Sequence, residues 1–168
     1  MNLKKIICWP PLLGGIGAGV TIAILAYITF QSTLAGTNYG LWLAASFGSS
    51  VVVVFGYPNN EFAQPKNVLF GHLLCAFIGI IFVVLFKISQ DRTIFFLAIG
   101  LAVGLSVMLM MALKITHPPA GGNTIVAMLA QDSFQFLIFP ILVGAVTIII
   151  GGIIYNRFIL KKKYPIKW

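Results

Sequence analysis

Long runs of apolar residues, separated by short polar segments, dominate the pattern of this sequence. A helix needs about 17–25 predominantly apolar residues to cross the hydrocarbon core of a bilayer. The segments between the runs hold glycine, proline, asparagine or charged residues, which are typical of turns. The pattern therefore predicts membrane-crossing α-helices over residues 12–30, 41–57, 68–86, 93–113 and 134–155.

The segment 118–131 does not fit this scheme. It opens with Pro118 and Pro119, continues with Gly121 and Gly122, and becomes apolar only toward its end. Irregular backbone at membrane depth is tolerated only where protein or a water-filled cavity satisfies its polar groups. The segment is therefore either a short sixth crossing or a re-entrant half-helix.

The distribution of basic residues favours six crossings. If the N-terminus is cytoplasmic and the short segment crosses, nine of the 11 basic residues lie inside, and only Lys87 and Arg92 lie outside, as the positive-inside rule expects. If the segment does not cross, the basic tail lands outside. We therefore expect an all-α, polytopic transmembrane helical bundle of about six membrane segments, including one short or broken segment after the His-Pro-Pro sequence.

This bundle is expected to form a single transmembrane domain over residues 1–168, with both termini in the cytoplasm. The first apolar run follows Lys4 and Lys5, as in a signal peptide. It is long enough to span and more spans follow, so we expect a retained first helix.

The apolar composition of the chain determines how its positive net charge is interpreted. The chain is 60% hydrophobic and 8% charged, with a mean hydropathy of +1.02, whereas soluble domains carry about 25% charged residues. A net charge of +8 would suggest nucleic acid in a soluble protein, but in a membrane protein it reports topology and contact with anionic lipid. The expected partner is the lipid bilayer, and no nucleic acid is expected.

The sequence shows no residue set typical of an enzyme or a metal centre. The two cysteines match no metal or redox spacing, and we expect no catalytic residue, metal or cofactor. His72 and His117 lie in or beside membrane segments, where ionisable residues are expensive and are functional candidates by default. Two other interpretations stay open, in which these histidines either ligate a haem or only brace helices by hydrogen bonds.

The two helix starts that contain prolines form the stronger candidate site. A helix N-terminus exposes free backbone N–H groups and the positive end of its dipole, which together bind an anion without a charged side chain. No carboxylate lies inside the predicted spans, so a small inorganic anion meets no fixed repulsion there. The candidate substrate-binding residues are Gln64, Pro65, Lys66, Asn67, His72, His117, Pro118, Pro119, Gly121, Gly122, Asn123 and Thr124.

Both starts occupy corresponding places in two hairpins, at residues 62–67 and 116–123. Each turn holds proline and begins a helix a few residues before an asparagine. Paired broken segments point to a transport site. Proline is common at helix starts in general, so coincidence is the open alternative.

Small residues recur at a spacing of four, as in Gly15 and Gly19 or Gly100 and Gly104. Such pairs let helices approach one another closely. Six short helices enclose little interior, and the glycine faces exceed what one bundle needs. We therefore expect a homo-oligomer.

Two signatures resemble those of a known family. The motif His117-Pro118-Pro119 is followed by Ala120-Gly121, and the stretch Ala63-Gln64-Pro65-Lys66-Asn67 precedes Gly71-His72. In this order and in a membrane context, residues 46–79 and 111–128 resemble the HPP family of integral membrane proteins. That family is usually described with four membrane segments, fewer than this pattern predicts. Gly122-Asn123 departs from the small apolar residues that we expect after the motif.

Members of the HPP family in cyanobacteria and chloroplasts are linked to nitrite transport, so the resemblance implies nitrite as the substrate. We therefore expect a channel or carrier that moves a small anion, nitrite first, across the bacterial inner membrane. The alternatives are a structural or assembly membrane protein without transport activity, and a redox subunit that holds haem between His72 and His117.

Overall fold

A computed structural model describes residues 9–32, 39–84, 92–130 and 134–168. Lys4, Lys5 and Lys87, on which part of the charge argument rests, lie outside these residues. Within the described ranges the chain is helical and holds no strand. The elements are α2 (Trp9–Ser32), α3 (Tyr39–Gly56), η1 (Glu61–Ala63), α4 (Pro65–Val84), α5 (Arg92–Ala112), η2 (Pro118–Ala120), α6 (Gly121–Ala130), η3 (Leu137–Leu142), α7 (Val143–Ile153) and η4 (Ile154–Ile159).

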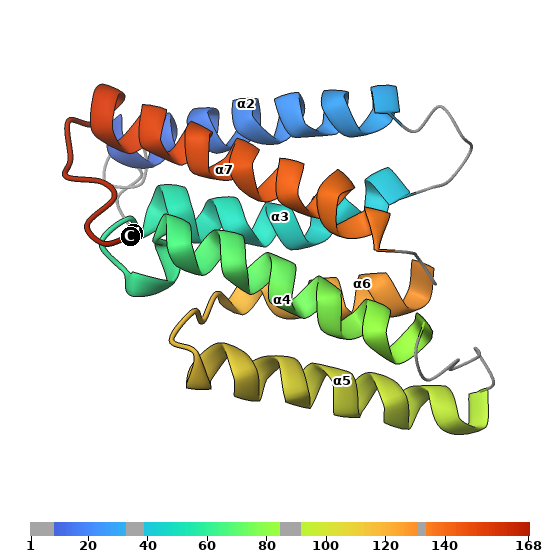
Figure 1. The fold of residues 1–168 in the computed structure, drawn as a ribbon. Helices are drawn as coiled ribbons and strands as arrows, with labels where there is room; N and C mark the ends of the chain where they lie inside the picture. The colour runs from blue at the N-terminus through green and yellow to red at the C-terminus, as the bar shows by residue number, and fades with distance from the viewer. Residues whose placement is uncertain (1–8, 33–38, 85–91, 131–133) are drawn as a thin grey trace, which may run out of the picture.

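The helices form one bundle in which α4 is the central element. In Figure 1, α2 and α5 lie on opposite sides of the bundle, and α3, α4, α6 and α7 lie between them. Half of the apolar part of α4 is buried, against 17% in α2 and 22% in α5. The broad apolar surfaces of α2 and α5 therefore face outward, as expected for helices whose main solvent is lipid.

The predicted all-α helical bundle is confirmed, and six helices lie near the predicted membrane segments. Four helices are long and apolar enough to cross a membrane, at Pro11–Thr29, Pro65–Val84, Ile94–Ala112 and Leu137–Ile159. The helices at the other two predicted segments are shorter: α3 has 18 residues and α6 has only 10. Figure 1 shows that α6 begins at the end of the bundle where α5 finishes and leads toward the opposite end, where the last helix starts.

One end of the bundle collects most of the described cations. The end of α5, the starts of α4 and α6 and the end of η4 all lie there, on the left of Figure 1. Basic residues near these helix ends are Lys66, Lys114, Arg157, Lys161, Lys162, Lys163 and Lys167. We call this the basic end. Arg92, at the start of α5, lies at the opposite end.

The last membrane helix ends later than predicted and is interrupted near its start. It runs from Leu137 to Ile159 rather than ending at residue 155. Phe139 has φ −127° and ψ 117° inside it, because Pro140 disfavours helical backbone in the residue before it. The interruption lies within η3, and from Pro140 onward the backbone continues without a break into the regular α7.

Close contact between α4 and α6 depends on glycine. A Cβ atom added to Gly79 would lie 2.5 Å from the carbonyl oxygen of Thr124, and one added to Gly71 would lie 2.9 Å from Cβ of His117. Gly71 and Gly79 lie in the series of small residues at a spacing of four, 71, 75 and 79, so this spacing does accompany close approach in α4. In contrast, a Cβ at Gly15, Gly19, Gly100 or Gly104 would meet no atom of the described residues within 4 Å, so these glycines do not serve packing within the described part of the chain.

Candidate functional site

Two histidines and a serine meet between α3, α4 and the turn before α6. His72 stands two turns inside α4 and is fully buried. Its Nε2 atom lies 2.8 Å from Oγ of Ser50, and its Nδ1 atom lies 2.7 Å from Nδ2 of Asn123. The ring of Phe47 packs against it, with 4.7 Å between centroids. His72 thus joins three helices, α3, α4 and α6.

His117 reaches the same serine from the opposite side. Its backbone is extended, with φ −135° and ψ 97°, as Pro118 requires of the residue before it. Its Nε2 atom lies 2.9 Å from Oγ of Ser50, and its Nδ1 atom lies 2.7 Å from the carbonyl oxygen of Phe62. The two imidazole centroids are 5.0 Å apart. We call Ser50, His72, His117 and Asn123 the histidine–serine cluster.

The partners of each nitrogen fix where the protons lie. A carbonyl oxygen only accepts, so His117 carries its proton on Nδ1 and donates to Phe62, and its Nε2 accepts from the hydroxyl of Ser50. An amide nitrogen only donates, so Nδ1 of His72 accepts from Asn123, and its Nε2 donates to Ser50. A continuous hydrogen-bonded chain results, in which both imidazoles are neutral.

This chain can take up one proton without losing a bond. The hydroxyl of Ser50 also lies 3.1 Å from the carbonyl oxygen of Ser46. If Nε2 of His117 gains a proton, it donates to Oγ of Ser50, and the hydroxyl proton turns to Ser46. Every nitrogen then still has a partner, so the geometry accommodates His117 in both protonation states.

The electrostatic surroundings oppose the charged state of His117. The side chain is fully buried, and burial lowers the pKa of His117 to about 4, although the hydrogen bond to Phe62 acts in the opposite direction. Burial penalises the imidazolium because it loses hydration. Protonation near neutral pH therefore needs an additional negative charge beside the ring.

The two predicted helix starts are brought together. Nδ2 of Asn67, in the first turn of α4, donates to the carbonyl oxygen of Thr116 at 2.9 Å. Thr124 in α6 donates to the carbonyl oxygen of Cys75 at 3.0 Å and lies 2.8 Å from Oγ of Ser106 in α5. The site residues from the two hairpins are thus neighbours in space, near the basic end.

A family comparison places this arrangement among known proteins. The family described as "HPP, transmembrane region" matches residues 5–165. The chain belongs to the HPP transmembrane family. It is accordingly a multi-pass membrane protein.

Two transmembrane proteins of Dictyostelium discoideum are similar to this HPP protein. One is 33% identical over 151 residues, which cover 88% of this chain and 52% of the relative. The other is 31% identical over 153 residues, which cover 89% and 48%. The chain thus spans about half the length of these curated relatives. No solved structure matches it.

The His-Pro-Pro turn does not offer the free backbone donors expected at its helix start. Pro118 and Pro119 have no N–H group. The N–H of Ala120 donates to the carbonyl oxygen of His117 at 2.9 Å, and that of Gly121 donates to both proline carbonyls. A tight 3₁₀ turn therefore uses these donors internally. The donors facing the centre are side chains instead.

The two glycines after the motif have different surroundings. Gly121 has φ −54°, in the ordinary helical region, and a Cβ there would meet no atom within 4 Å. The space beside Gly121 is open, so an anion could approach the backbone there. The backbone is not left-handed at this position, so its conformation does not require glycine. A Cβ at Gly122 would lie 2.8 Å from Oγ of Ser46, so Gly122 is the position that keeps α6 close to α3.

The other predicted residues of the first helix start lie at the edge of the site. Nε2 of Gln64 donates to the carbonyl oxygens of Pro58 and Asn60, each at 2.8 Å. Oε1 of Gln64 accepts from the N–H of Ile166 at 2.9 Å. Gln64 therefore orders the turn and the tail. Pro65 is buried beside it, and Lys66 is exposed.

Ser50 was absent from the candidates derived from sequence, although it is the centre of the cluster. The available signal was its spacing of four from Ser46 on an otherwise apolar helix, which places both hydroxyls on one face. Ser106, the partner of Thr124, was also absent from the candidates, because it is a single serine in an apolar helix. The haem alternative does not fit this geometry, because both Nε2 atoms point at one hydroxyl and rings 5.0 Å apart leave no room for a macrocycle.

Proposed function

We propose that this HPP protein transports a small monovalent anion, with nitrite as the first candidate, across the bacterial inner membrane. The histidine–serine cluster carries this proposal. It gathers buried hydroxyl, imidazole and amide donors between three helices, while the described membrane helices contain no carboxylate. Such a site stabilises an anion by neutral donors, and nothing of like charge repels it there.

The anion would enter by exchanging with bonds inside the cluster. The Ser50 hydroxyl, the His72 Nε2–H and the Asn123 amide already point inward, so the anion replaces one partner of each instead of recruiting donors from outside. A proton on Nε2 of His117 would then pair with the anion. Because the burial penalty on the imidazolium falls when a negative charge lies beside it, anion and proton favour each other's entry.

Proteoliposome flux measurements test this function. We would compare nitrite, nitrate, formate and chloride uptake with and without an inward pH gradient. Ser50→Ala removes the hydroxyl shared by the histidines and is expected to abolish nitrite uptake. The matched control is Ser49→Ala, because Ser49 is exposed and bonds only its own helix, at the carbonyl oxygen of Ala45. Equal uptake by both variants would contradict the proposal.

A structural role without transport is the second candidate. It draws on the observation that the polar atoms of the cluster already have protein partners, as a brace between helices requires. Purified protein that passes none of the four anions, but melts at lower temperature as Ser50→Ala than as Ser49→Ala, would support the brace and exclude the transporter.

The orientation and assembly that accompany transport are also proposals. The described cations at the basic end support placing that end, with both termini, in the cytoplasm. The outward glycines Gly100 and Gly104 of α5 support a homo-oligomer, since small residues at this spacing allow close approach of helices from another subunit.

A further inference from the structure

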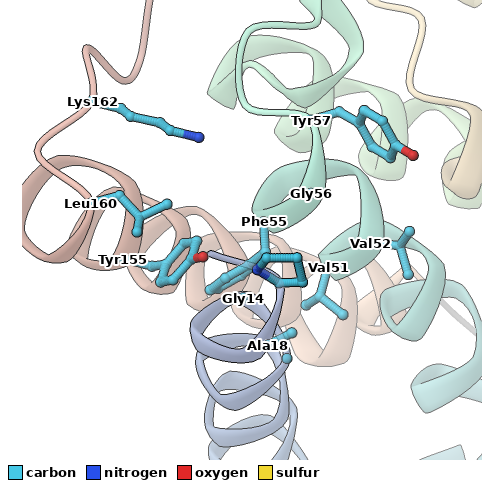
Figure 2. A pocket seen from close by; sticks show the side chains of 12 residues that line it. Gly14, Ala18, Val51, Val52, Phe55, Gly56, Tyr57, Tyr155, Leu160 and Lys162 are labelled. Carbon is cyan, nitrogen blue, oxygen red and sulfur yellow. The ribbon is translucent and has the colours of Figure 1, made fainter. Parts of the chain in front are cut away.

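An apolar hollow lies at the basic end, away from the histidine–serine cluster. It has a volume of about 410 Å³ between the start of α2, the end of α3 and the C-terminal segment after α7. This is within the roughly 300–1,000 Å³ of small-molecule sites. Its walls include Val51, Phe55 and Leu160. Figure 2 shows Lys162 extending from the tail toward the open side of the hollow.

The hollow exists because α2 presents small residues to it. Gly14, Gly15 and Ala18 line one side, where longer side chains would fill the space. A Cβ at Gly14 would lie 3.1 Å from the hydroxyl oxygen of Tyr155, whereas a Cβ at Gly15 would meet no atom within 4 Å. Gly15 is therefore the position from which a larger side chain enters the hollow without displacing protein.

A second hollow, with basic walls, adjoins the first. It has a volume of about 480 Å³, and Lys162 lines both. The chain reverses here: Lys161 has φ 54°, and the N–H of Lys162 donates to the carbonyl oxygen of Asn156 at 2.8 Å, in the manner of a helix C-cap. The reversal gathers four cations around one space: Arg157, Lys161, Lys162 and Lys163.

These cations lack negative partners within the described part of the chain. The acidic side chain that the structure describes is that of Glu61, which is exposed in the turn after α3 and forms no ion pair with another described residue. Four like charges at one site repel one another and attract an anion. An apolar hollow that shares a wall with a cationic one matches a ligand that is itself apolar at one end and anionic at the other.

We propose that these two hollows bind an anionic phospholipid of the leaflet at the basic end. The phosphodiester lies among Arg157 and Lys161 to Lys163, and part of one acyl chain lies in the apolar hollow against Gly15 and Val51. Val51 follows Ser50 in α3, so lipid occupancy bears directly on the helix that carries the centre of the cluster. Lys162 spans the boundary, with its stem on apolar surface and its ammonium group at the phosphate.

Lipid binding by the purified full-length protein tests this proposal. Native mass spectrometry and thermal melting in detergent would compare phosphatidylglycerol, phosphatidylcholine with the same acyl chains, and inorganic phosphate. We expect phosphatidylglycerol to bind about tenfold more tightly than phosphatidylcholine, and inorganic phosphate to give no stabilisation. Equal binding of the two lipids, or equal stabilisation by phosphate alone, would overturn the lipid site.

Two matched pairs of variants separate the parts of the site. Gly15→Leu fills the apolar hollow and is expected to weaken the binding of both lipids. Gly19 is exposed one turn further along α2, so Gly19→Leu is expected to leave the binding of both lipids unchanged. Lys162→Gln is expected to lower the affinity for phosphatidylglycerol about fivefold and to change the affinity for phosphatidylcholine little. Lys114→Gln removes the same charge at the same end, outside both hollows, and serves as its control. Identical behaviour within either pair would refute the assignment.

Discussion

Replacing Gly79 by alanine adds one methyl group where α4 meets α6. That carbon would lie 2.5 Å from the carbonyl oxygen of Thr124 and 2.8 Å from Cβ of Ala127, whereas ordinary contact begins near 3.4 Å. The carbonyl oxygen of Thr124 belongs to the backbone and cannot rotate away as the end of a side chain can. Helix α6 therefore has to move away from α4 by roughly 1 Å. Overpacking of this kind costs about 1–3 kcal/mol.

The displacement also reaches the histidine–serine cluster. Asn123 precedes Thr124, and both hold α6 to α4, through the 2.7 Å contact with His72 and the 3.0 Å bond to Cys75. Stretching these contacts is expected to lower anion flux together with stability. In a chain of this size about 1 kcal/mol corresponds to roughly 2–4 °C in melting temperature, so the clash predicts a loss of about 2–12 °C.

The assay is thermal melting of purified protein in detergent, with Gly48→Ala as the control. A Cβ at Gly48 meets no atom within 4 Å, so this variant has the gain in helix propensity without the clash. The difference in melting temperature between the two variants isolates the contact. If Gly79→Ala melts at or above Gly48→Ala and transports normally, the close approach of α4 and α6 does not hold the site together.

Four further outcomes follow from the site and its surroundings. His117→Gln keeps hydrogen bonding but cannot hold a proton, so it is expected to abolish pH-stimulated nitrite flux while nitrite binding remains; unchanged stimulation would exclude His117 as the proton carrier. The pKa of His117 is lowered by burial to about 4, below the ordinary value of about 6.5, so the unfolded chain binds more protons between these values; melting temperature should fall as pH drops from about 6.5 toward 4, and less so in His117→Gln. In a Cys8→Ser background, Lys163→Cys should resist an impermeant thiol reagent in intact cells and Ser89→Cys should react; the reverse pattern would invert the topology. Light scattering corrected for detergent should give a mass above the 18.2 kDa of one chain, and a mass equal to it would exclude the homo-oligomer.

The membrane helices could be predicted from the sequence because length and apolar content are properties of each segment by itself. Helix α4 begins at Pro65, three residues before the predicted span, since proline suits the first helical turn, where its missing N–H costs nothing. The short α6 is ambiguous by length. The expectation that α6 crosses the membrane rests only on the basic residues of the segments beyond it. That argument uses the charge distribution of the whole chain and no property of α6.

The site could be predicted only in part because its centre depends on packing. His72 and His117 were identified because titratable side chains are rare in apolar segments. Ser50 was not, because a serine in a helix commonly bonds the carbonyl four residues earlier, and the hydroxyls of both Ser49 and Ser50 lie within reach of such a carbonyl. The spacing of Ser50 from Ser46 is a weak local signal, and only the packing of α4 and the His-Pro-Pro turn against α3 makes Ser50 the inward one.

The prediction of free backbone N–H donors after the His-Pro-Pro motif was wrong for a different reason. The prediction assumed that a helix start leaves its first N–H groups unpaired. The residues before α6 form their own tight turn, in which Ala120 and Gly121 donate to carbonyls only a few residues earlier. Two prolines remove the remaining donors, so the turn is complete without a ligand.

The bonds that hold residues 164–166 to the α3–α4 turn mean that this turn cannot reach its final structure until those residues have been synthesised. The hydroxyl of Tyr164 donates to the carbonyl oxygen of Ala63 across 101 residues, and the N–H of Ile166 donates to Gln64 across 102. At about 5–20 residues per second, the turn waits on the order of 5–20 s for these partners. Until then its carbonyl and amide groups need water. The loop between the second and third helices must therefore stay at the aqueous surface until residues 164–166 have been synthesised and pack against it.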